Sequence, residues 1–181
     1  RRVNTNEMIR FSFIFLLLFL VACRAEKTKD STAKKWGTAH SVDFNQELNA
    51  REDLKIKLFL AHHRELKMDS TVCESGLRFM RYFHGIGPNL AKVGQEAMIR
   101  VKIELLDGRV CYETAKDEIE RVVIAKSEKE TGIHEALQLM MKGDKAKLIL
   151  PSYLGHGLLG DRTKIPPQSV LYIDLQLIDL N

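Results

Sequence analysis

Much of the second half of the chain alternates between apolar and polar residues, which is the pattern of half-buried strands because successive side chains point to opposite faces. The alternation is clearest at residues 99–105 and returns in the final run at 169–180. Asp107-Gly108 separates two strand-like runs and predicts a hairpin turn. Weaker runs of the same kind lie at 76–83, 109–112, 119–125 and 145–150.

One short helix interrupts these strands. Gly132 precedes it, residues 134–141 form it and Gly143 closes it, and a long loop rich in Gly and Pro follows over 152–168. Five or so antiparallel strands around one short helix predict an α+β domain that covers residues 73–181.

A helical period precedes this domain and predicts an amphipathic helix over residues 42–69. Asp43 is a suitable N-cap with Gln46 as its capping partner, and no Gly or Pro interrupts the segment. An amphipathic helix must bury its apolar stripe, either on the following domain or on the same helix, residues 43–68, of a second copy in a homodimer. The stripe comprises Phe44, Leu48, Leu54, Leu58 and Ala61, widened by Phe59 and Leu60.

Residues 1–22 are typical of a leader rather than of a folded domain. Met8 is the expected start, and the apolar run 11–22 that follows a cationic stretch is too short for a transmembrane helix. Residues 20–23, Leu-Val-Ala-Cys, resemble a bacterial lipobox, which implies lipidation of Cys23 and removal of everything before it. The alternatives are an uncleaved anchor, or an ordinary signal peptide followed by a chance cysteine.

Composition and charge limit the classes of partner that the protein is expected to bind. Hydrophobic residues make up 45% of the chain and charged residues 29%, which is typical of a globular protein. Removal of the leader, with three basic residues and one acidic residue, lowers the formal net charge from +4 to +2, so no nucleic-acid partner is expected. Residues 23–41 are rich in Lys, Ser, Thr and Ala and predict a flexible tether to a membrane. Arg24, rather than Asp, follows the cysteine and favours the outer membrane.

No metal site or cofactor is expected. His62 and His63 are adjacent, so they point in different directions on a helix and do not suit a shared metal. Cys73 and Cys111 could form a disulfide in an oxidising compartment, although separate buried thiols are favoured. Cys111 and His156 with an acidic partner would suit a thiol protease, but nothing in the local sequence indicates an activated thiol.

Five blocks of the second half resemble the FK506-binding-protein (FKBP) type of peptidyl-prolyl isomerase in their order and spacing. The resemblance covers residues 73–181, and the predicted hairpin lies where that family has its own. The leader, tether and helix in front make the whole layout similar to the gliding-motility-associated lipoproteins of the same isomerase class. The blocks read GIHEALQLM from Gly132, GDKAKL from Gly143, LPSYLGHG from Leu150, IPP from Ile165 and LYIDL from Leu171.

This resemblance implies a strongly twisted antiparallel half-barrel wrapped over the short helix, with an apolar pocket between them. By position, Tyr112 and His156 are implied to be the catalytic contacts, where the family commonly has Asp and Tyr. Several aromatic residues common in the family are replaced, so we expect weak binding of its macrolide inhibitors. We also expect catalysis that is slow or that depends on burial and backbone contacts. The implied substrate pocket comprises Val101, Cys111, Ile133, Tyr153, Ile165 and Ile173.

Two functions are compatible with these features. The first is a lipid-anchored peptidyl-prolyl cis-trans isomerase that assists the folding of exported proteins at the bacterial envelope. Its clients would be proline-containing polypeptides, and its chemistry would need no cofactor. The second is a catalytically weak or inactive binding module of the same fold in a motility or secretion assembly.

Overall fold

The computed structural model describes residues 38–68 and 73–181. The chain divides into two compact units, 1–41 and 42–181, and the second contains all the described strands. The predicted leader and the predicted lipidation site at Cys23 lie outside the described residues, as does most of the predicted tether. Among the described helices, none combines the length and the apolar character that a membrane crossing requires.

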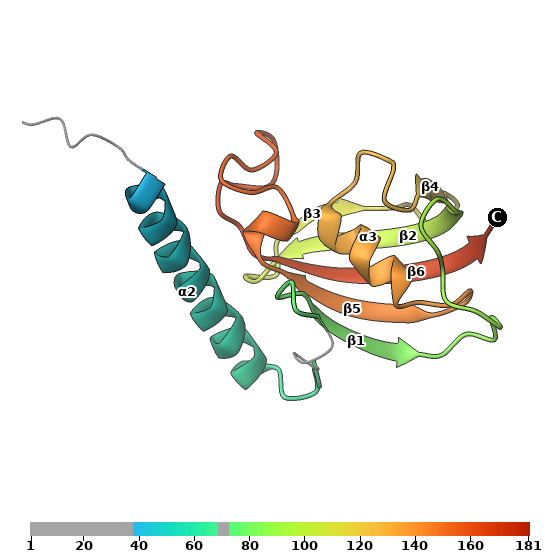
Figure 1. Cartoon of the computed structure of the whole chain (residues 1–181). Helices are drawn as coiled ribbons and strands as arrows, with labels where there is room; N and C mark the ends of the chain where they lie inside the picture. Colours follow the sequence, from blue (N-terminus) through green and yellow to red (C-terminus); the bar gives the residue numbers. More distant parts are fainter. Residues whose placement is uncertain (1–37, 69–72) are drawn as a thin grey trace, which may run out of the picture. The chain divides into compact units, whose positions relative to one another are not determined.

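The described elements follow the order expected for the domain, with one long helix ahead of it (Figure 1). They are α2 (Thr38–His62), β1 (Arg78–Phe83), β2 (Glu96–Leu105), β3 (Val110–Glu113), β4 (Glu120–Val123), α3 (Thr131–Gln138), β5 (Lys145–Leu150), the single 3-10 turn η1 (Ser152–Leu154) and β6 (Leu171–Leu180).

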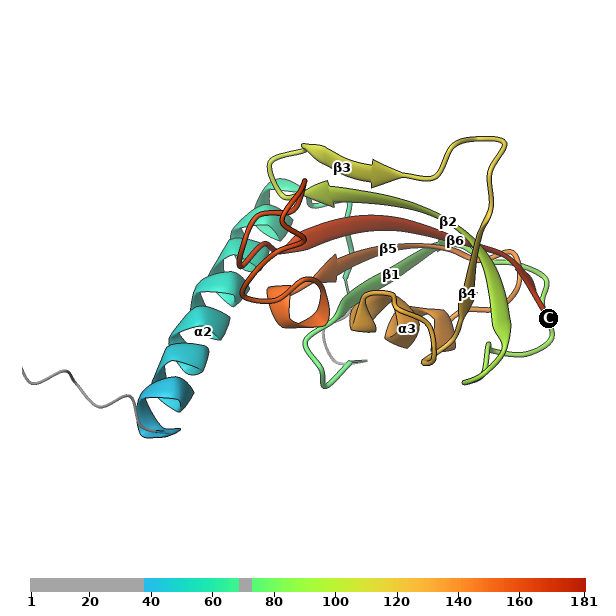
Figure 2. The ribbon, with the colours of Figure 1, turned by 90° about the horizontal axis from the view of Figure 1, so that it is seen from above.

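The strands form one antiparallel sheet in the order β1-β5-β6-β2-β3, and β4 pairs with the first part of β2. The long strands β2 and β6 are its central pair, with Val101 opposite Leu175 and Ile103 opposite Ile173. The register of β2 shifts between Met98 and Ile99 in its pairing with β6, and between Ile103 and Glu104 in its pairing with β3. The sheet curves over α3, which lies against one of its faces (Figure 2).

The hydrophobic core lies between α3 and the facing side of the sheet. Side chains of β2 alternate between half-buried and buried along the whole strand, as its sequence predicts. Fully burying one large aliphatic side chain contributes about 1.5–3 kcal/mol to folding. The structure confirms the predicted α+β half-barrel over one short helix. The core includes Ile99, Ile103, Ile133, Leu137, Leu148, Leu171 and Ile173.

The long helix α2 begins earlier than its sequence pattern predicts. It starts at Thr38, so the expectation that Asp43 is its N-cap is wrong. Residues 39–42 contain no Gly or Pro, and nothing in them ends a helix that has already started. The helix ends at His62, and the segment up to Met68 continues in turns.

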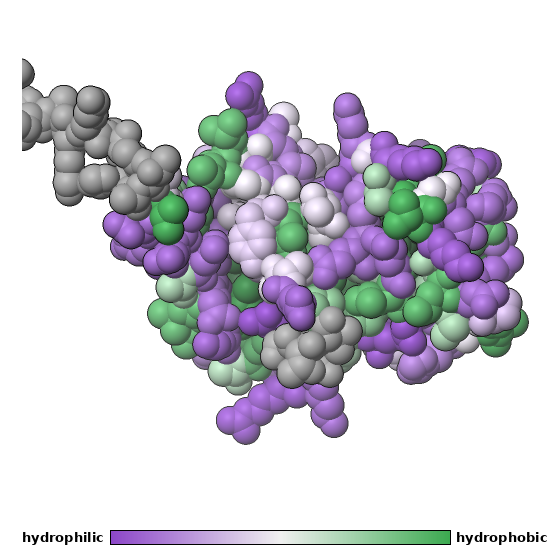
Figure 3. All heavy atoms as spheres, in the orientation of Figure 1, coloured by the Kyte–Doolittle hydropathy of each residue, from purple (hydrophilic) through white to green (hydrophobic). Residues whose placement is uncertain are grey.

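The face of α2 that packs on the domain is only partly the predicted stripe. Ile56 is buried, and the ring of Phe59 lies 5.4 Å from that of Tyr172, centroid to centroid. Hydrophobic side chains elsewhere on the helix are exposed between hydrophilic ones (Figure 3). The exposed members of the predicted stripe include Phe44, Leu54 and Leu58, with 40, 58 and 54% of their surfaces accessible.

Two polar contacts fix which face of α2 packs. The carboxylate of Glu52, fully buried, accepts the backbone N–H of Ser152 at 2.8 Å. The guanidinium of Arg78 donates to Asp53 at 3.0 Å. Periodicity of apolar residues does not reveal such contacts, which explains why the packed face differs from the predicted stripe. Because Ser152 opens η1, α2 contacts the start of the loop that carries His156.

The two cysteines of the domain are both buried, and Cys111 is a free thiol, so the structure contains no bridge between Cys73 and Cys111. Within residues 38–68 and 73–181, no group of three His, Cys, Asp or Glu side chains is arranged to hold a metal ion.

Candidate active site

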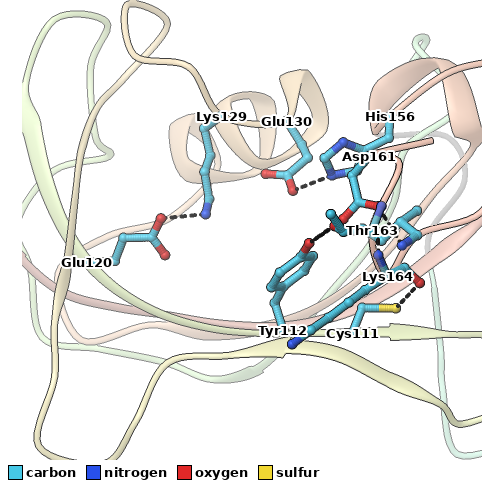
Figure 4. A network of polar contacts seen from close by, with 10 residues as sticks. Cys111, Tyr112, Glu120, Lys129, Glu130, His156, Asp161, Thr163 and Lys164 are labelled. Carbon is cyan, nitrogen blue, oxygen red and sulfur yellow. Dashed lines mark hydrogen bonds and ion pairs between the residues drawn. The ribbon is translucent and has the colours of Figure 1, made fainter. Parts of the chain in front are cut away.

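A cavity of about 510 Å³ opens beside the inner face of β2, within the range of about 300–1,000 Å³ that is common for ligand pockets. Its apolar lining comes from Val101, Ile103 and Ile119. The rest of its wall comes from β3, from the connection to β4, from the residues before α3 and from the loop after η1. Figure 4 shows six of the polar members: Tyr112, Glu120, Lys129, Glu130, His156 and Asp161. The other three are Glu113, Thr114 and Glu118.

The loop beside the cavity is closed by Asp161. One carboxylate oxygen of Asp161 accepts the backbone N–H groups of Thr163, Lys164 and Ile165 at 2.8, 2.9 and 2.7 Å. The loop also needs Gly160, which has a φ of +65°, and a Cβ there would lie 2.2 Å from the carbonyl oxygen of Ile165. One side chain therefore organises a turn of five residues, 161–165, at the edge of the cavity.

Tyr112 joins the hairpin to this loop. Its hydroxyl donates to the second carboxylate oxygen of Asp161 and lies 2.8 Å from the hydroxyl of Thr163. The hydrogen bond to Asp161 raises the pKa of the Tyr112 hydroxyl. Burial acts to raise the pKa of Asp161, but the hydrogen bonds from Tyr112, Thr163 and Ile165 outweigh it, and the pKa lies below its ordinary value. Tyr112 thus lines the cavity while its hydroxyl proton is committed to the loop.

His156 and Glu130 both line the cavity, and their side chains point toward each other (Figure 4). Nε2 of His156 lies 3.1 Å from Oε1 of Glu130, and the Glu130 side chain is only 8% exposed. A carboxylate accepts, so Nε2–H donates, and a neutral His156 ring then has only an acceptor at Nδ1. The second oxygen of Glu130 is buried and has no hydrogen-bond partner among the described residues.

A third polar pair lies further along the same wall. The ammonium of Lys129 contacts the carboxylate of Glu120 at 2.5 Å, with 16 and 35% of the two side chains exposed. Carboxylates nevertheless outnumber cations around the cavity. Glu113 and Glu118 are exposed at its mouth, and the structure gives neither side chain an ion pair within the described part of the chain.

The turn before α3, which carries Lys129 and Glu130, is held by His134. Its Nδ1 accepts the backbone N–H of Ala125 at 3.0 Å, so Nε2–H donates to the carbonyl oxygen of Ser127, also at 3.0 Å. His134 is 8% exposed and lies at the start of the helix, outside the cavity lining.

The remaining candidates from the sequence lie at different depths. Val101 lines the cavity with Tyr112 and His156. Four others belong to the buried core and are not part of the lining: Cys111, Ile133, Ile165 and Ile173. Burial raises the pKa of the Cys111 thiol, which disfavours the thiolate that a thiol nucleophile requires.

Tyr153 does not reach the cavity lining. It lies in η1, about half of its surface is exposed, and its hydroxyl donates to the carbonyl oxygen of Ser75 at 2.8 Å. This contact fixes the segment in front of β1 instead. The side chain directed toward the cavity from this part of the chain belongs to His156.

Sequence reasoning missed seven polar members of the lining. Four of them make the side-chain contacts described above: Glu120, Lys129, Glu130 and Asp161. Two local signals pointed to them. Asp161 precedes a short polar stretch inside a Gly/Pro loop, which is typical of an Asx turn. Glu130 directly precedes the first turn of α3. Their approach to Tyr112 and His156 depends on pairings across the fold, which the sequence does not display.

Comparison with known proteins agrees with this architecture. The family model of FKBP-type peptidyl-prolyl cis-trans isomerases matches residues 87–178. Macrophage infectivity potentiator of Trypanosoma cruzi is 30% identical over 175 residues, which cover 97% of this chain and 85% of that protein. FKBP-type peptidyl-prolyl cis-trans isomerase FkpA of Buchnera aphidicola is 28% identical over 149 residues, 81% of this chain and 57% of the relative.

A solved structure shares the fold. The crystal structure of a peptidyl-prolyl cis-trans isomerase from Pseudomonas syringae matches with a TM-score of 0.60 and 20% identity, over 75% of this chain and 95% of that one. The family match covers more than half of the present chain, and the T. cruzi relative is matched over most of its own length. The chain belongs to the FKBP-type peptidyl-prolyl cis-trans isomerases and is an enzyme of that class.

Proposed function

We propose that this enzyme isomerises Xaa-Pro bonds of exported polypeptides at the bacterial cell envelope, where a lipid on Cys23 holds it to the outer membrane. The cavity beside β2 carries the catalytic part of this proposal, because it combines an apolar lining with a rim fixed by hydrogen bonds. The lipobox-like residues 20–23 carry the part that concerns location.

The chemistry requires neither a nucleophile nor a metal. Rotation about an Xaa-Pro bond is slow because it breaks amide resonance, with a barrier of about 18–20 kcal/mol. A twisted amide is less polar than a planar one, so a cavity with little water favours the twisted form and lowers the barrier. Val101, Ile103 and Ile119 would contact the proline ring and its neighbours.

Neither predicted catalytic contact is poised to donate a proton to the substrate carbonyl. The hydroxyl of Tyr112 donates to Asp161, and Nε2–H of His156 donates to Glu130. We therefore infer that Tyr112 and His156 shape and dry the cavity, and that burial of the amide supplies most of the rate enhancement.

Replacement of Cys23 by serine tests the anchor. We expect the unaltered protein, expressed in a bacterium with lipoprotein processing, to enter the detergent phase in a Triton X-114 partition. The Cys23→Ser variant should remain in the aqueous phase with the same isomerase activity, because Cys23 lies outside the domain that forms the cavity. Equal partition of both proteins would exclude lipidation, whereas equal absence of isomerase activity would exclude the catalytic role.

A homodimer through helix residues 43–68 is part of the same proposal, supported by the exposed Phe44, Leu54 and Leu58. Burying large apolar side chains such as these drives association. We expect light scattering to give twice the chain mass, and a Phe44→Glu, Leu58→Glu double variant to give the monomer mass. A monomer mass for the unaltered chain would refute the dimer.

The second candidate, a binding module in a motility or secretion assembly, is favoured by one observation. Aliphatic residues and Cys111 occupy positions that are commonly aromatic in the family, so the site has less aromatic surface to grip a proline ring. Peptide binding at the cavity without acceleration of isomerisation would support this role.

A further inference from the structure

Among the described residues that line the cavity, Glu130 is the buried side chain with an unpartnered oxygen. Its side chain is more than nine-tenths buried, Oε1 lies 3.1 Å from Nε2 of His156, and Oε2 has no hydrogen-bond partner among the described residues. A buried acceptor without a partner destabilises the fold, and the destabilisation is larger when the acceptor is charged. Isomerisation in a dry apolar cleft has no need of such a group, so its presence in the wall requires another explanation.

The other groups of the wall leave this acceptor free. Lys129 is engaged by Glu120, and both oxygens of Asp161 are engaged by Tyr112 and by backbone N–H groups. Figure 4 shows Glu130 between these two engaged sets, facing His156. The wall therefore contains one buried carboxylate that can still accept a hydrogen bond from a ligand cation.

Two further carboxylates line the mouth of the same cavity. Glu113 and Glu118 are exposed there, and among the described residues neither carboxylate has a hydrogen bond or ion pair to another side chain. Glu113 interacts with Lys102 only at longer range. Charges of one sign around a cleft concentrate ligands of the opposite charge and speed their association. Mouth and wall thus favour the same kind of substrate.

We propose that the cavity selects polypeptides with Lys or Arg immediately before proline, and that the carboxylate of Glu130 accepts the cationic side chain. This inference rests on the isomerase function proposed above and adds its substrate class. The apolar lining takes the proline ring, and the preceding side chain extends toward Glu130. Because Oε2 is buried, the carboxylate turns into the cavity to accept a charge-assisted hydrogen bond from the cation. Glu113 and Glu118 attract the cation to the mouth.

The test compares peptides that differ only in the residue before proline. The purified chain is assayed by exchange NMR, without a coupling protease, on Leu-Pro, Lys-Pro, Nε-acetyl-Lys-Pro and Glu-Pro peptides. We expect kcat/KM for Lys-Pro to exceed that for acetyl-Lys-Pro about tenfold and that for Glu-Pro by more. Acetylation retains the chain and removes the charge, so this pair isolates the ionic contribution.

Two variants locate the acceptor. Glu130→Gln retains the shape of the side chain and should reduce the ratio of Lys-Pro to acetyl-Lys-Pro to less than about threefold. Glu128→Gln makes the same charge change at an exposed residue outside the lining, two positions away, and should leave that ratio as it is. Thermal unfolding of both variants verifies that they are folded.

Each outcome has a distinct consequence. Acceleration of Leu-Pro with no advantage for Lys-Pro would overturn the substrate preference and leave the isomerase function intact. No acceleration of any peptide would overturn the isomerase function and the preference together. A Lys-Pro preference that survives in Glu130→Gln would remove Glu130 as the acceptor.

Discussion

Replacing Asp144 by alanine will destabilise the domain by about 3–5 kcal/mol, the largest effect that we expect from one side chain. Asp144 is fully buried after the short helix, where its carboxylate accepts the backbone N–H groups of Gly85 and Met141, both at 2.7 Å. Nε of Arg81 lies 2.9 Å from the same carboxylate. Alanine leaves two backbone donors without their acceptor and a largely buried guanidinium without its counter-ion.

Thermal unfolding followed by circular dichroism measures this effect. We expect Asp144→Ala to lower Tm by about 10 °C or more. The matched control is Asp117→Ala, because Asp117 is exposed and its side chain has no hydrogen bond or ion pair within the described residues. Surface changes of that kind stay within about 0.5 kcal/mol. Equal Tm values for the two variants would show that the cluster around Asp144 does not hold β1 to the segment after α3.

Replacing Asp161 by alanine should cost roughly ten- to a hundredfold in kcat/KM for a Leu-Pro peptide, since displacement of a site wall by about 1 Å can have that effect. The variant removes the acceptor of three backbone N–H groups and of the Tyr112 hydroxyl at once. The loop should then move away from the hairpin and admit water to the cavity. The core does not include Asp161, so Tm should fall much less than in Asp144→Ala.

Arg162→Ala is the control in the same loop, because Arg162 is exposed and does not line the cavity. Its activity should stay within about twofold of the unaltered chain. Full activity of Asp161→Ala would exclude the loop from the catalytic site.

The pH dependence follows from the same contacts. The folded-state pKa of Asp161 lies below its ordinary value of about 3.9, so its contribution to stability is fully present above that value. The contribution is lost only as the pH falls through the lowered folded-state pKa. Loosening of the loop by acid should therefore begin below about pH 4, and the loop should remain closed at pH 5.

The strands of the domain were largely predictable because burial on one face imposes a period of two. Val101 and Ile103 alternate with charged residues, and the structure buries them as the alternation indicates. The start of α2 and its packed face were not predictable in this way. Glu52 lies in the contact face because a backbone N–H of η1 meets it, and no local pattern indicates that partner.

The position of the candidate cavity was predictable, but the hydrogen bonds in its wall were not. The family resemblance indicated Val101, Tyr112 and His156, and all three line the cavity. The roles of the two polar members depend on Asp161 and Glu130, which approach them from distant segments. Tyr153 has the residue type expected of a pocket, but the turn of η1 directs its hydroxyl to Ser75.

Exchange NMR of a Leu-Pro peptide with a catalytic amount of the full chain is the most direct test that this cavity isomerises prolyl bonds. Uncatalysed exchange takes tens to hundreds of seconds at 25 °C, so the peptide alone gives no cross-peaks between its cis and trans signals on the timescale of a second. We expect such cross-peaks to appear when the chain is added. The exchange rate should be at least tenfold lower with Asp161→Ala. Exchange no faster than that of the peptide alone, with the chain folded, would contradict the catalytic role of the cavity.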